Sequence, residues 1–501
     1  MTATSQAKSY RKIVSSTAIF GSAQLVGVVI NMIRGKLVAL ILHSAGMGVM
    51  TLLSNAANTI QQFALLGMNV AAVRNISQAN EGASPQVLAA TIRIVRSLFV
   101  VAAIIGLLFT IIGSPIISQT SFGSYQYIPL LLLLSVSVFL SILGTGEMTV
   151  MQGLRRYKQL AFCSIVPPLC GLLLSVPIYY IWGIDGIVPA MILSGAIYYL
   201  VMRRYSFRDR REKSEKERLS LRTVWKQGHD IIQLGMVMTF GTIVGTITTY
   251  SLMAFISNTG SVSDVGFYQA ANIITVQYVS MIFTAMATDY YPRLSAVYHD
   301  SQEEAHILVN QQTEVVLLSI TPLAMLMILT APLLISILLT NEFQTIRPLI
   351  YYLGLANIFK ALCFPMDYIA YAKGDKKYIL WVETVWGNFK TFTVIAGCYL
   401  QFGLIGLGYG ALASAVIDVL VSIVLTRWRY GFRLSGSVLR LLVVMLLLAF
   451  GCFFGAFAES SMLSYAVMTA TTLICIVYSL IMLNRRMNLI AVLKRMKGGK
   501  A

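Results

Sequence analysis

Four basic side chains lie inside or beside apolar runs long enough to cross a bilayer: Arg34, Lys36, Lys360 and Lys390. A charge at the centre of a bilayer costs roughly 3 kcal/mol or more unless it is paired or reaches water. In a wet cavity such a cation can bind an anion, because arginine grips a phosphate through two parallel hydrogen bonds and lysine acts as a point charge. An internal ion pair that fixes helix packing is the alternative role.

Carboxylates accompany Lys390. Glu383 precedes it by seven residues, which places both on one face of an α-helix, and Asp418 lies within the next apolar run. A carboxylate beside a lysine in a membrane can bind a proton or a sodium ion, or it can neutralise the lysine. We expect Glu383 and Asp418 to be ion-coupling residues, with internal pairing as the alternative. Glu147 and Asp367 fall nearer the ends of their runs, and we expect them to be half-solvated.

Arg34 and Lys36 diverge by about 200° if they share an α-helix. Both can face one ligand only if Gly35 breaks the helix. The alternative is that the first helix ends near Met32 and both cations sit at the outer interface. The apolar stretch Leu37–Leu42 allows the helix to continue, so both alternatives remain open.

The second apolar run carries a stripe of amide side chains. We predict that Asn58 and Gln62 contact the substrate, as part of a polar cavity wall. Hydrogen bonding between helices explains such amides equally well. The full stripe consists of Asn55, Asn58, Gln61, Gln62 and Asn69.

The elements that position these residues follow from composition. The chain has 501 residues, of which 57% are hydrophobic and 12% are charged, and a soluble domain would carry about twice that charged share. We therefore predict an all-α polytopic membrane protein. Helices are expected rather than a barrel because the runs are continuously apolar.

About fourteen runs reach the roughly 20 residues that a membrane-spanning helix needs. They lie at residues 13–33, 47–72, 97–118, 128–152, 160–183, 185–202, 230–256, 266–288, 313–340, 347–372, 378–402, 404–426, 439–458 and 463–484. The first run is long and has no small-residue cleavage site at its end, so we expect it to remain as a helix rather than to be a cleaved signal peptide.

Basic residues orient the bundle. If the N-terminus is cytoplasmic, nearly all of the 38 Lys and Arg fall on the cytoplasmic side, as the positive-inside rule requires. Both termini are therefore expected in the cytoplasm. The net charge of +18 follows from this topology and favours contact with anionic lipid over nucleic acid.

The six cysteines all lie in apolar runs without paired spacing. Neither a disulfide framework nor a metal site is predicted. The only cofactor we expect is a coupling ion, H⁺ or Na⁺.

A strongly charged segment at residues 203–229 divides the chain. We predict a first six-helix lobe at residues 1–202, a basic cytoplasmic linker at 203–229, a second lobe at 230–429, and a terminal helix pair with a basic tail at 430–501. A weak internal repeat supports two lobes: Gly48–Ser77 and Gly266–Ser295 both begin with Gly, carry "AAN" early and end in an Arg-containing turn.

Four stretches carry a resemblance that extends over essentially the whole chain: "KLVALILHSAGMGVMTLL", "VGFYQAA", "TDYYPRLSA" and "AYAKGDKKY". Together, in this order, they resemble the polysaccharide or O-antigen flippase family of the multidrug, oligosaccharidyl-lipid and polysaccharide (MOP) exporter superfamily. One departure is "HSAGMG" (His43–Gly48), where that family usually has Gly-Pro before Gly-x-Gly.

The resemblance implies two pseudo-symmetric six-helix lobes around a central cavity. It also implies export of an undecaprenyl-pyrophosphate-linked oligosaccharide to the outer leaflet of a bacterial inner membrane, for O-antigen, capsule or exopolysaccharide synthesis. Other membrane proteins of glycan assembly are possible partners, and the intramembrane cations would bind the pyrophosphate.

No P-loop, HExxH or GxSxG motif occurs, and we expect no catalytic activity. The alternatives are a cation-coupled drug or metabolite antiporter of the same superfamily and, from another class, a membrane glycan polymerase or glycosyltransferase. The lysines disfavour the antiporter. The short external connections disfavour the polymerase.

Overall fold

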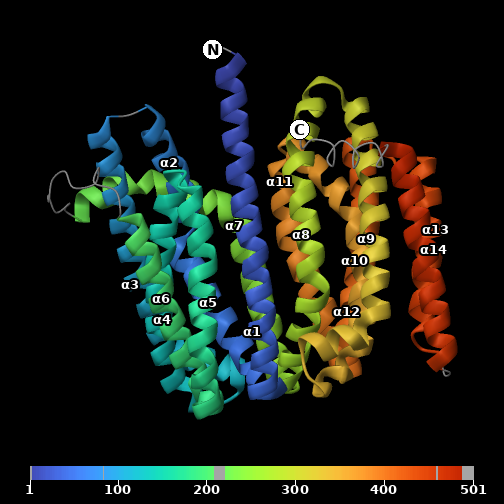
Figure 1. The fold of residues 1–501 in the computed structure, drawn as a ribbon, viewed down its shortest axis with the longest axis horizontal. Coiled ribbons are helices and arrows are strands. Elements are labelled where there is room, and N and C mark those ends of the chain that lie inside the picture. Colours follow the sequence, from blue (N-terminus) through green and yellow to red (C-terminus); the bar gives the residue numbers. More distant parts are fainter. Residues whose placement is uncertain (1–2, 83, 208–220, 459–460, 488–501) are drawn as a thin grey trace. The chain divides into compact units, whose positions relative to one another are not determined.

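The computed structural model describes residues 3–82, 84–207, 221–458 and 461–487, which are helical almost throughout and contain no strand (Figure 1). The first helices are α1 (Ala3–Leu65), α2 (Met68–Gly82), α3 (Pro85–Phe122), α4 (Ile128–Gly153), α5 (Tyr157–Trp182), α6 (Ile187–Ser206) and α7 (Leu221–Thr259). They are followed by α8 (Val262–Asp300), α9 (Gln302–Leu338), α10 (Arg347–Lys373), α11 (Lys376–Tyr378), α12 (Gly387–Tyr430), α13 (Gly436–Gly455) and α14 (Ser461–Met487). A π-helical segment, η5 (Ile379–Trp386), joins α11 to α12.

Local sequence signals fix several helix ends. Ser84, Ser301 and Ser435 cap α3, α9 and α13, each accepting a hydrogen bond from the backbone N–H three residues on. Gly374 and Gly431 end α10 and α12 in the left-handed conformation that glycine adopts without strain. These caps confine the turns to a few residues.

Each of the fourteen predicted spans corresponds to a helical segment. α1 breaks at His43 (φ 57°, ψ −166°) and α12 breaks at Gly403 (φ 60°, ψ −142°), so each of these helices holds all or most of two predicted spans. Ten segments of the described chain are long and apolar enough to cross a membrane. Three of them contain a break with positive φ, at His43, at Gly183 between α5 and α6, and at Gly403. The predicted span 266–288 lies in α8.

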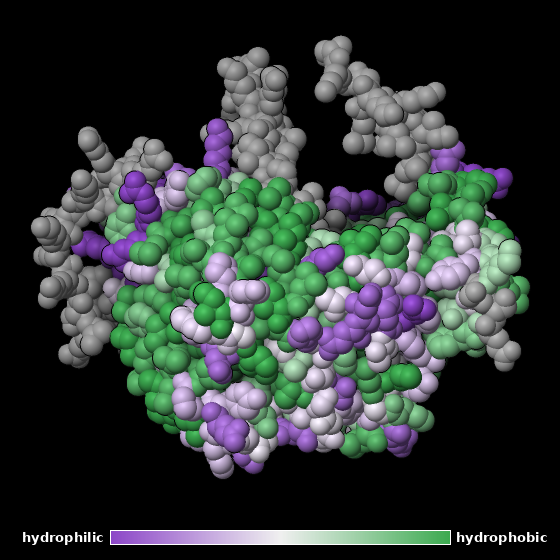
Figure 2. All heavy atoms as spheres, turned by 60° about the horizontal axis from the view of Figure 1, so that its bottom comes forward, coloured by the Kyte–Doolittle hydropathy of each residue, from purple (hydrophilic) through white to green (hydrophobic). Residues whose placement is uncertain are grey.

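Apolar side chains are exposed on the surface of these helices, as expected where lipid replaces water. Examples are Ile112 in α3, Leu173 in α5 and Val424 in α12. Figure 2 shows such residues over broad areas of one face. The chain is a multi-pass membrane protein.

The chain forms two compact units, residues 1–266 and 267–501. In the first unit α4 packs against α3 and α6, α5 packs against α1 and α6, and α7 packs against α1, α2 and α3. Its core includes Ile76, Val95, Phe99 and Ile142. The predicted division at 203–229 was based on the charged segment and on the internal repeat, and the packing of the helices does not test it. Residues 208–220 of that predicted linker and the tail at 488–501 lie outside the described residues.

In the second unit α10 packs against α9 and α12. The terminal pair α13 and α14 packs on itself, and both of its helices contact α9. This arrangement makes α9 and α10 the buried centre of the unit, with Ile328, Ile350, Leu355 and Ile358 fully buried.

Glu147 is more buried than the sequence predicted. Its side chain is only 6% exposed and forms an ion pair with Arg96, at 3.0 Å. Arg96 also donates to Ser206 Oγ at 2.8 Å and stacks over Phe207, with its guanidinium 3.8 Å from the ring centre. The prediction of a half-solvated carboxylate was wrong because it judged depth along the helix and not the neighbouring helices.

Candidate functional site

A polar cavity of about 400 Å³ lies within the second unit, among α10, η5 and α12. Its charged lining residues are Lys360 and Asp367 from α10, Glu383 from η5 and Asp418 from α12. Its apolar lining residues include Phe283, Phe364 and Trp386, and its uncharged polar lining residues are Tyr378, Asn388, Thr391 and Ser422.

Lys390 lies behind this cavity and is neutralised. Its side chain is 3% exposed, donates to the carbonyl of Ser414 at 3.1 Å and forms an ion pair with Asp418, whose side chain is 40% exposed. Thr391 and Ser414 share a hydrogen bond of 3.1 Å between their hydroxyls beside the pair. The internal ion pair that the sequence left open is present between these two residues.

Lys360 has a different environment. Its side chain is exposed to the cavity, and the described residues place no carboxylate within ion-pair distance of it. The two lysines therefore differ: Lys390 is buried in an ion pair, and Lys360 is exposed and lines the cavity.

Asp367 is the residue that sequence reasoning left out of the site. It accepts a hydrogen bond from Ser422 at 2.8 Å and lines the same cavity as Lys360. A signal was available, because a residue two helical turns after Lys360 lies on the same face of α10.

Glu383 lies in the π-helical segment. Thr384 Oγ1 donates to the carbonyl of Ile379, five residues back, at 3.0 Å, in keeping with π-helical spacing. The seven-residue spacing from Glu383 to Lys390 was interpreted as α-helical, so the inferred common face does not follow. Glu383 nevertheless lines the cavity with Asp418, and one of its carboxylate oxygens is buried without a hydrogen bond among the described residues.

The pair Arg34 and Lys36 lies on an uninterrupted helix. α1 keeps helical geometry from Met32 through Gly35 as far as His43, so the span does not end near Met32. The two side chains therefore diverge and do not face one ligand from the same side. Arg34 lies within hydrogen-bond distance of Tyr179 in α5, at 3.4 Å.

The amide stripe of α1 is partly used in packing. Gln61 donates to Thr145 of α4 at 3.2 Å, and Asn55 donates to the carbonyl of Thr51 within α1. Asn58 is exposed and Gln62 is half-buried, and their predicted contact with substrate stays a prediction. All of these residues belong to the first unit, whereas the polar cavity belongs to the second.

Sequence comparison identifies the family. Residues 37–348 match the family described as polysaccharide biosynthesis protein. The chain belongs to this family. Comparison with curated protein sequences gives no match.

Several solved structures share the fold of this chain. Lipid II flippase MurJ, in an inward closed conformation, has a TM-score of 0.69 at 12% identity, covering 94% of this chain and all of that chain. A multidrug resistance MATE family transporter of the MOP superfamily, inward-facing, has a TM-score of 0.54 at 16% identity, covering 83% and 94%. A MOP superfamily transporter from Pyrococcus furiosus, titled for the reverse polarity of its binding pocket, has a TM-score of 0.55 at 15% identity, covering 84% and 95%.

The chain therefore shares the fold of these flippase and transporter structures, as the resemblance implied. Within the described residues, no group of three or more His, Cys, Asp or Glu is arranged to hold a metal ion.

Proposed function

We propose that this protein is a flippase that moves an undecaprenyl-pyrophosphate-linked oligosaccharide from the cytoplasmic to the outer leaflet by alternating access. It would act in a bacterial inner membrane, with both termini cytoplasmic, and supply O-antigen, capsule or exopolysaccharide synthesis. Family membership and the likeness in fold to a lipid II flippase support this proposal.

The observation that carries the proposal is the exposed Lys360, which lines the polar cavity of the second unit. A pyrophosphate must cross hydrocarbon, where an unpaired charge costs roughly 3 kcal/mol or more. A fixed cation in a wet cavity lowers that cost. Lys390 contributes by holding Asp418, which otherwise would repel the phosphate.

The carboxylates of the cavity are the proposed coupling sites. Glu383 and Asp418 would take up a proton or a sodium ion, and Asp367 joins them because it lines the same cavity. Loading one of these carboxylates with a cation reduces the negative charge near Lys360 and so favours binding of an anionic headgroup.

A cation-coupled drug or metabolite antiporter is the second candidate. The observation in its favour is that three carboxylates share the cavity with Lys360, which suits a cationic substrate. A membrane glycan polymerase is a weaker alternative, and nothing in the site supports it.

The test is translocation of a fluorescent undecaprenyl-pyrophosphate oligosaccharide in proteoliposomes. We compare wild type with Lys360→Ala, Lys390→Ala and Lys377→Ala at matched reconstitution, because Lys377 is exposed in α11 and does not line the cavity. We expect Lys360→Ala to lose most of the activity and Lys377→Ala to keep it. Imposed pH or sodium gradients, with Glu383→Gln and Asp418→Asn, identify the ion.

Two outcomes oppose the proposal. If wild type moves no lipid-linked glycan but exports a soluble cation, the antiporter is the function. If Lys360→Ala folds normally and transports at the wild-type rate, the cavity cation does not act on the substrate.

A further inference from the structure

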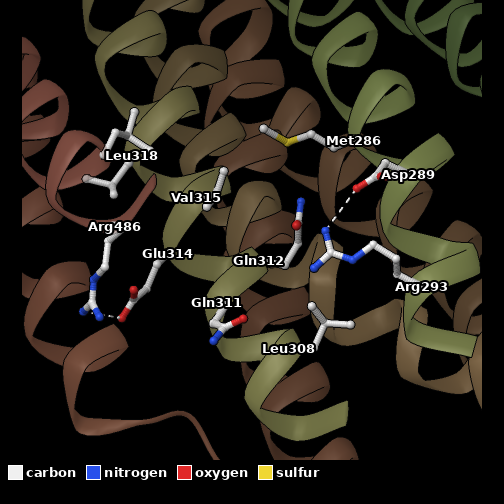
Figure 3. Close-up of a pocket in the computed structure, with 11 residues that line it drawn as sticks. Met286, Asp289, Arg293, Leu308, Gln311, Gln312, Glu314, Val315, Leu318 and Arg486 are labelled. Carbon is white, nitrogen blue, oxygen red and sulfur yellow. Dashed lines mark hydrogen bonds and ion pairs between the residues drawn. The ribbon is translucent and has the colours of Figure 1, made fainter. Parts of the chain in front are cut away.

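A second cavity lies in the second unit, apart from the residues assigned above. It has a volume of about 640 Å³ and is lined by α8, α9 and α14. Figure 3 shows two ion pairs on opposite sides of it, with Gln312 between them.

Each ion pair offers both signs of charge to the cavity. Arg293 and Asp289 of α8 are joined at 3.2 Å, and Arg486 of α14 contacts Glu314 of α9 at 3.3 Å. The arginine side chains are 56% and 51% exposed, so their remaining donors are accessible. Glu314 is also held by the hydroxyl of Ser437, at 2.7 Å.

The cavity is amphipathic along the direction of the helices. Arg293 and Arg486 follow the ends of the predicted spans 266–288 and 463–484, and Gln311 and Gln312 directly precede the span 313–340. Met286, Val315, Leu318 and Leu483 line it within those spans. Apart from Leu308 and Glu314, the polar groups therefore lie at the level of lipid headgroups, and the apolar groups lie at the level of acyl chains.

We propose that this cavity binds one phospholipid that carries a phosphate and a primary ammonium, of the phosphatidylethanolamine type. The phosphate is placed between Arg293 and Arg486, where guanidinium groups and glutamine amides donate to it. The ammonium is placed against Asp289, whose carboxylate is 76% exposed and accepts its N–H donors, whereas Glu314 is 11% exposed and already holds Arg486 and Ser437.

Charge complementarity selects this headgroup among bilayer lipids. An anionic glycerol headgroup would place a negative charge near both carboxylates, without an ammonium to pair with Asp289. A choline headgroup has no N–H to donate. The phospholipid would lie in the leaflet on the side of the basic segments that connect the helices, because Arg293 and Arg486 belong to those segments.

The test is lipid binding to the purified full-length protein by native mass spectrometry, with titrations of phosphatidylethanolamine, phosphatidylcholine and phosphatidylglycerol of identical acyl chains. We expect one phosphatidylethanolamine to bind about three- to fivefold more tightly than the other two, the size of one exposed charge-pair contact. Asp289→Asn and Arg293→Gln should remove this preference. Both side chains are exposed, so folding should survive. Arg440→Gln is the control, because Arg440 is exposed at the start of α13 and does not line the cavity.

Equal binding of the three lipids, or an unchanged preference in Asp289→Asn and Arg293→Gln, overturns the proposal. So does a preference for phosphatidylglycerol, which would make the cavity an anion site. Displacement of phosphatidylethanolamine by equimolar undecaprenyl pyrophosphate would assign the cavity to the transported lipid instead. Since binding is measured without transport, the result is independent of the proposed flippase activity.

Discussion

Gly266 packs directly against the backbone of Ser44 within the first unit. A Cβ at Gly266 would lie 2.1 Å from the Ser44 carbonyl oxygen and 3.0 Å from the Gly48 nitrogen, and a Cβ at Gly48 would lie 1.9 Å from the Val262 oxygen. Ser44 and Gly48 are one helical turn apart, as are Val262 and Gly266, so the second half of α1 and the start of α8 cross at two small contact points. Both segments of the internal repeat begin at this crossing.

The first prediction concerns this crossing. Gly266→Val forces the two backbones apart, and we expect a destabilisation of about 1–3 kcal/mol, the usual cost of overpacking. Gly397→Val is the matched control, because nothing lies within 4 Å of a Cβ at Gly397. Thermal unfolding in detergent measures both. Equal stability of the two variants would show that the crossing relaxes without cost.

His43 supplies a second prediction. Its φ of 57° and ψ of −166° belong to a region that is almost confined to glycine, at a cost of about 1–3 kcal/mol. His43→Gly should therefore raise the melting temperature, by roughly 1 kcal/mol of stability after the extra flexibility of unfolded glycine is subtracted. His43→Ala loses the same side-chain contacts but keeps the strained backbone, and it should not be stabilised. If Ala stabilises as much as Gly, the backbone is not the cause.

The ion pair of Lys390 and Asp418 gives a third prediction, which is an asymmetry. Asp418→Asn leaves an ammonium that is 3% exposed without its counter-ion, and we expect a loss of about 3 kcal/mol or more. Lys390→Met leaves a carboxylate that is 40% exposed and can be hydrated, so the loss should be smaller. Lys360→Met serves as the control for removing an exposed lysine from the cavity.

Melting temperatures of these variants at pH 7 provide the measurement. The double variant Lys390→Met with Asp418→Leu should recover part of the stability lost by Asp418→Asn, because no charge is left unpaired. A larger loss for Lys390→Met than for Asp418→Asn would contradict this account.

A fourth prediction concerns pH. Asp375, between α10 and α11, accepts from Arg429 Nε at 2.5 Å and Nη2 at 3.0 Å, from the N–H of Tyr378 and from the hydroxyl of Tyr430. The Arg429 hydrogen bonds are the main reason that the pKa of Asp375 is lowered to about 2, whereas an unfolded aspartate has a pKa of about 3.9. Because the folded pKa is the lower one, the carboxylate stabilises the fold above about pH 4, and this contribution is lost as the pH falls toward 2.

The difference in melting temperature between wild type and Asp375→Asn reports this contribution. We expect it to be constant from about pH 5 to pH 7 and to shrink below about pH 4. Asp300→Asn, at an 83% exposed carboxylate, controls for loss of a surface charge. A difference that stays constant down to about pH 3 would mean that the charge of Asp375 does not contribute.

Hydropathy located the helices because each one must satisfy its own backbone hydrogen bonds in lipid. It could not locate the break at His43, since this turn has no polar loop and the flanking residues remain apolar. For the same reason it could not decide between the two alternatives for Arg34 and Lys36. The continuous helix through Gly35 excludes an end near Met32, and it also excludes the break at Gly35 that would let both cations face one ligand.

The site was harder to predict than the fold, because rotation of a helix about its axis decides which side chains meet. The sequence identified Lys360, Lys390, Glu383 and Asp418 as candidate site residues, and the structure places them in or beside one cavity. Lys390 pairs with Asp418 and not with Glu383, because residues seven apart on one helix are separated by about 10 Å along its axis. Asp367 was left out of the site because its depth in the membrane was considered, whereas the face of α10 on which it lies was not.

The π-helical segment η5 also bears on insertions and deletions. A π-helix bonds residue i to i+5 and therefore holds one residue more than an α-helix over the same bonded turn. Deletion of one residue between Ile379 and Val382 would convert the segment to an α-helix without shifting Lys390. Glu383 would still precede Lys390 by seven residues, but its side chain would rotate about the helix axis. In α10, which has no such spare residue, a deletion between Lys360 and Asp367 would turn one of them away from the cavity.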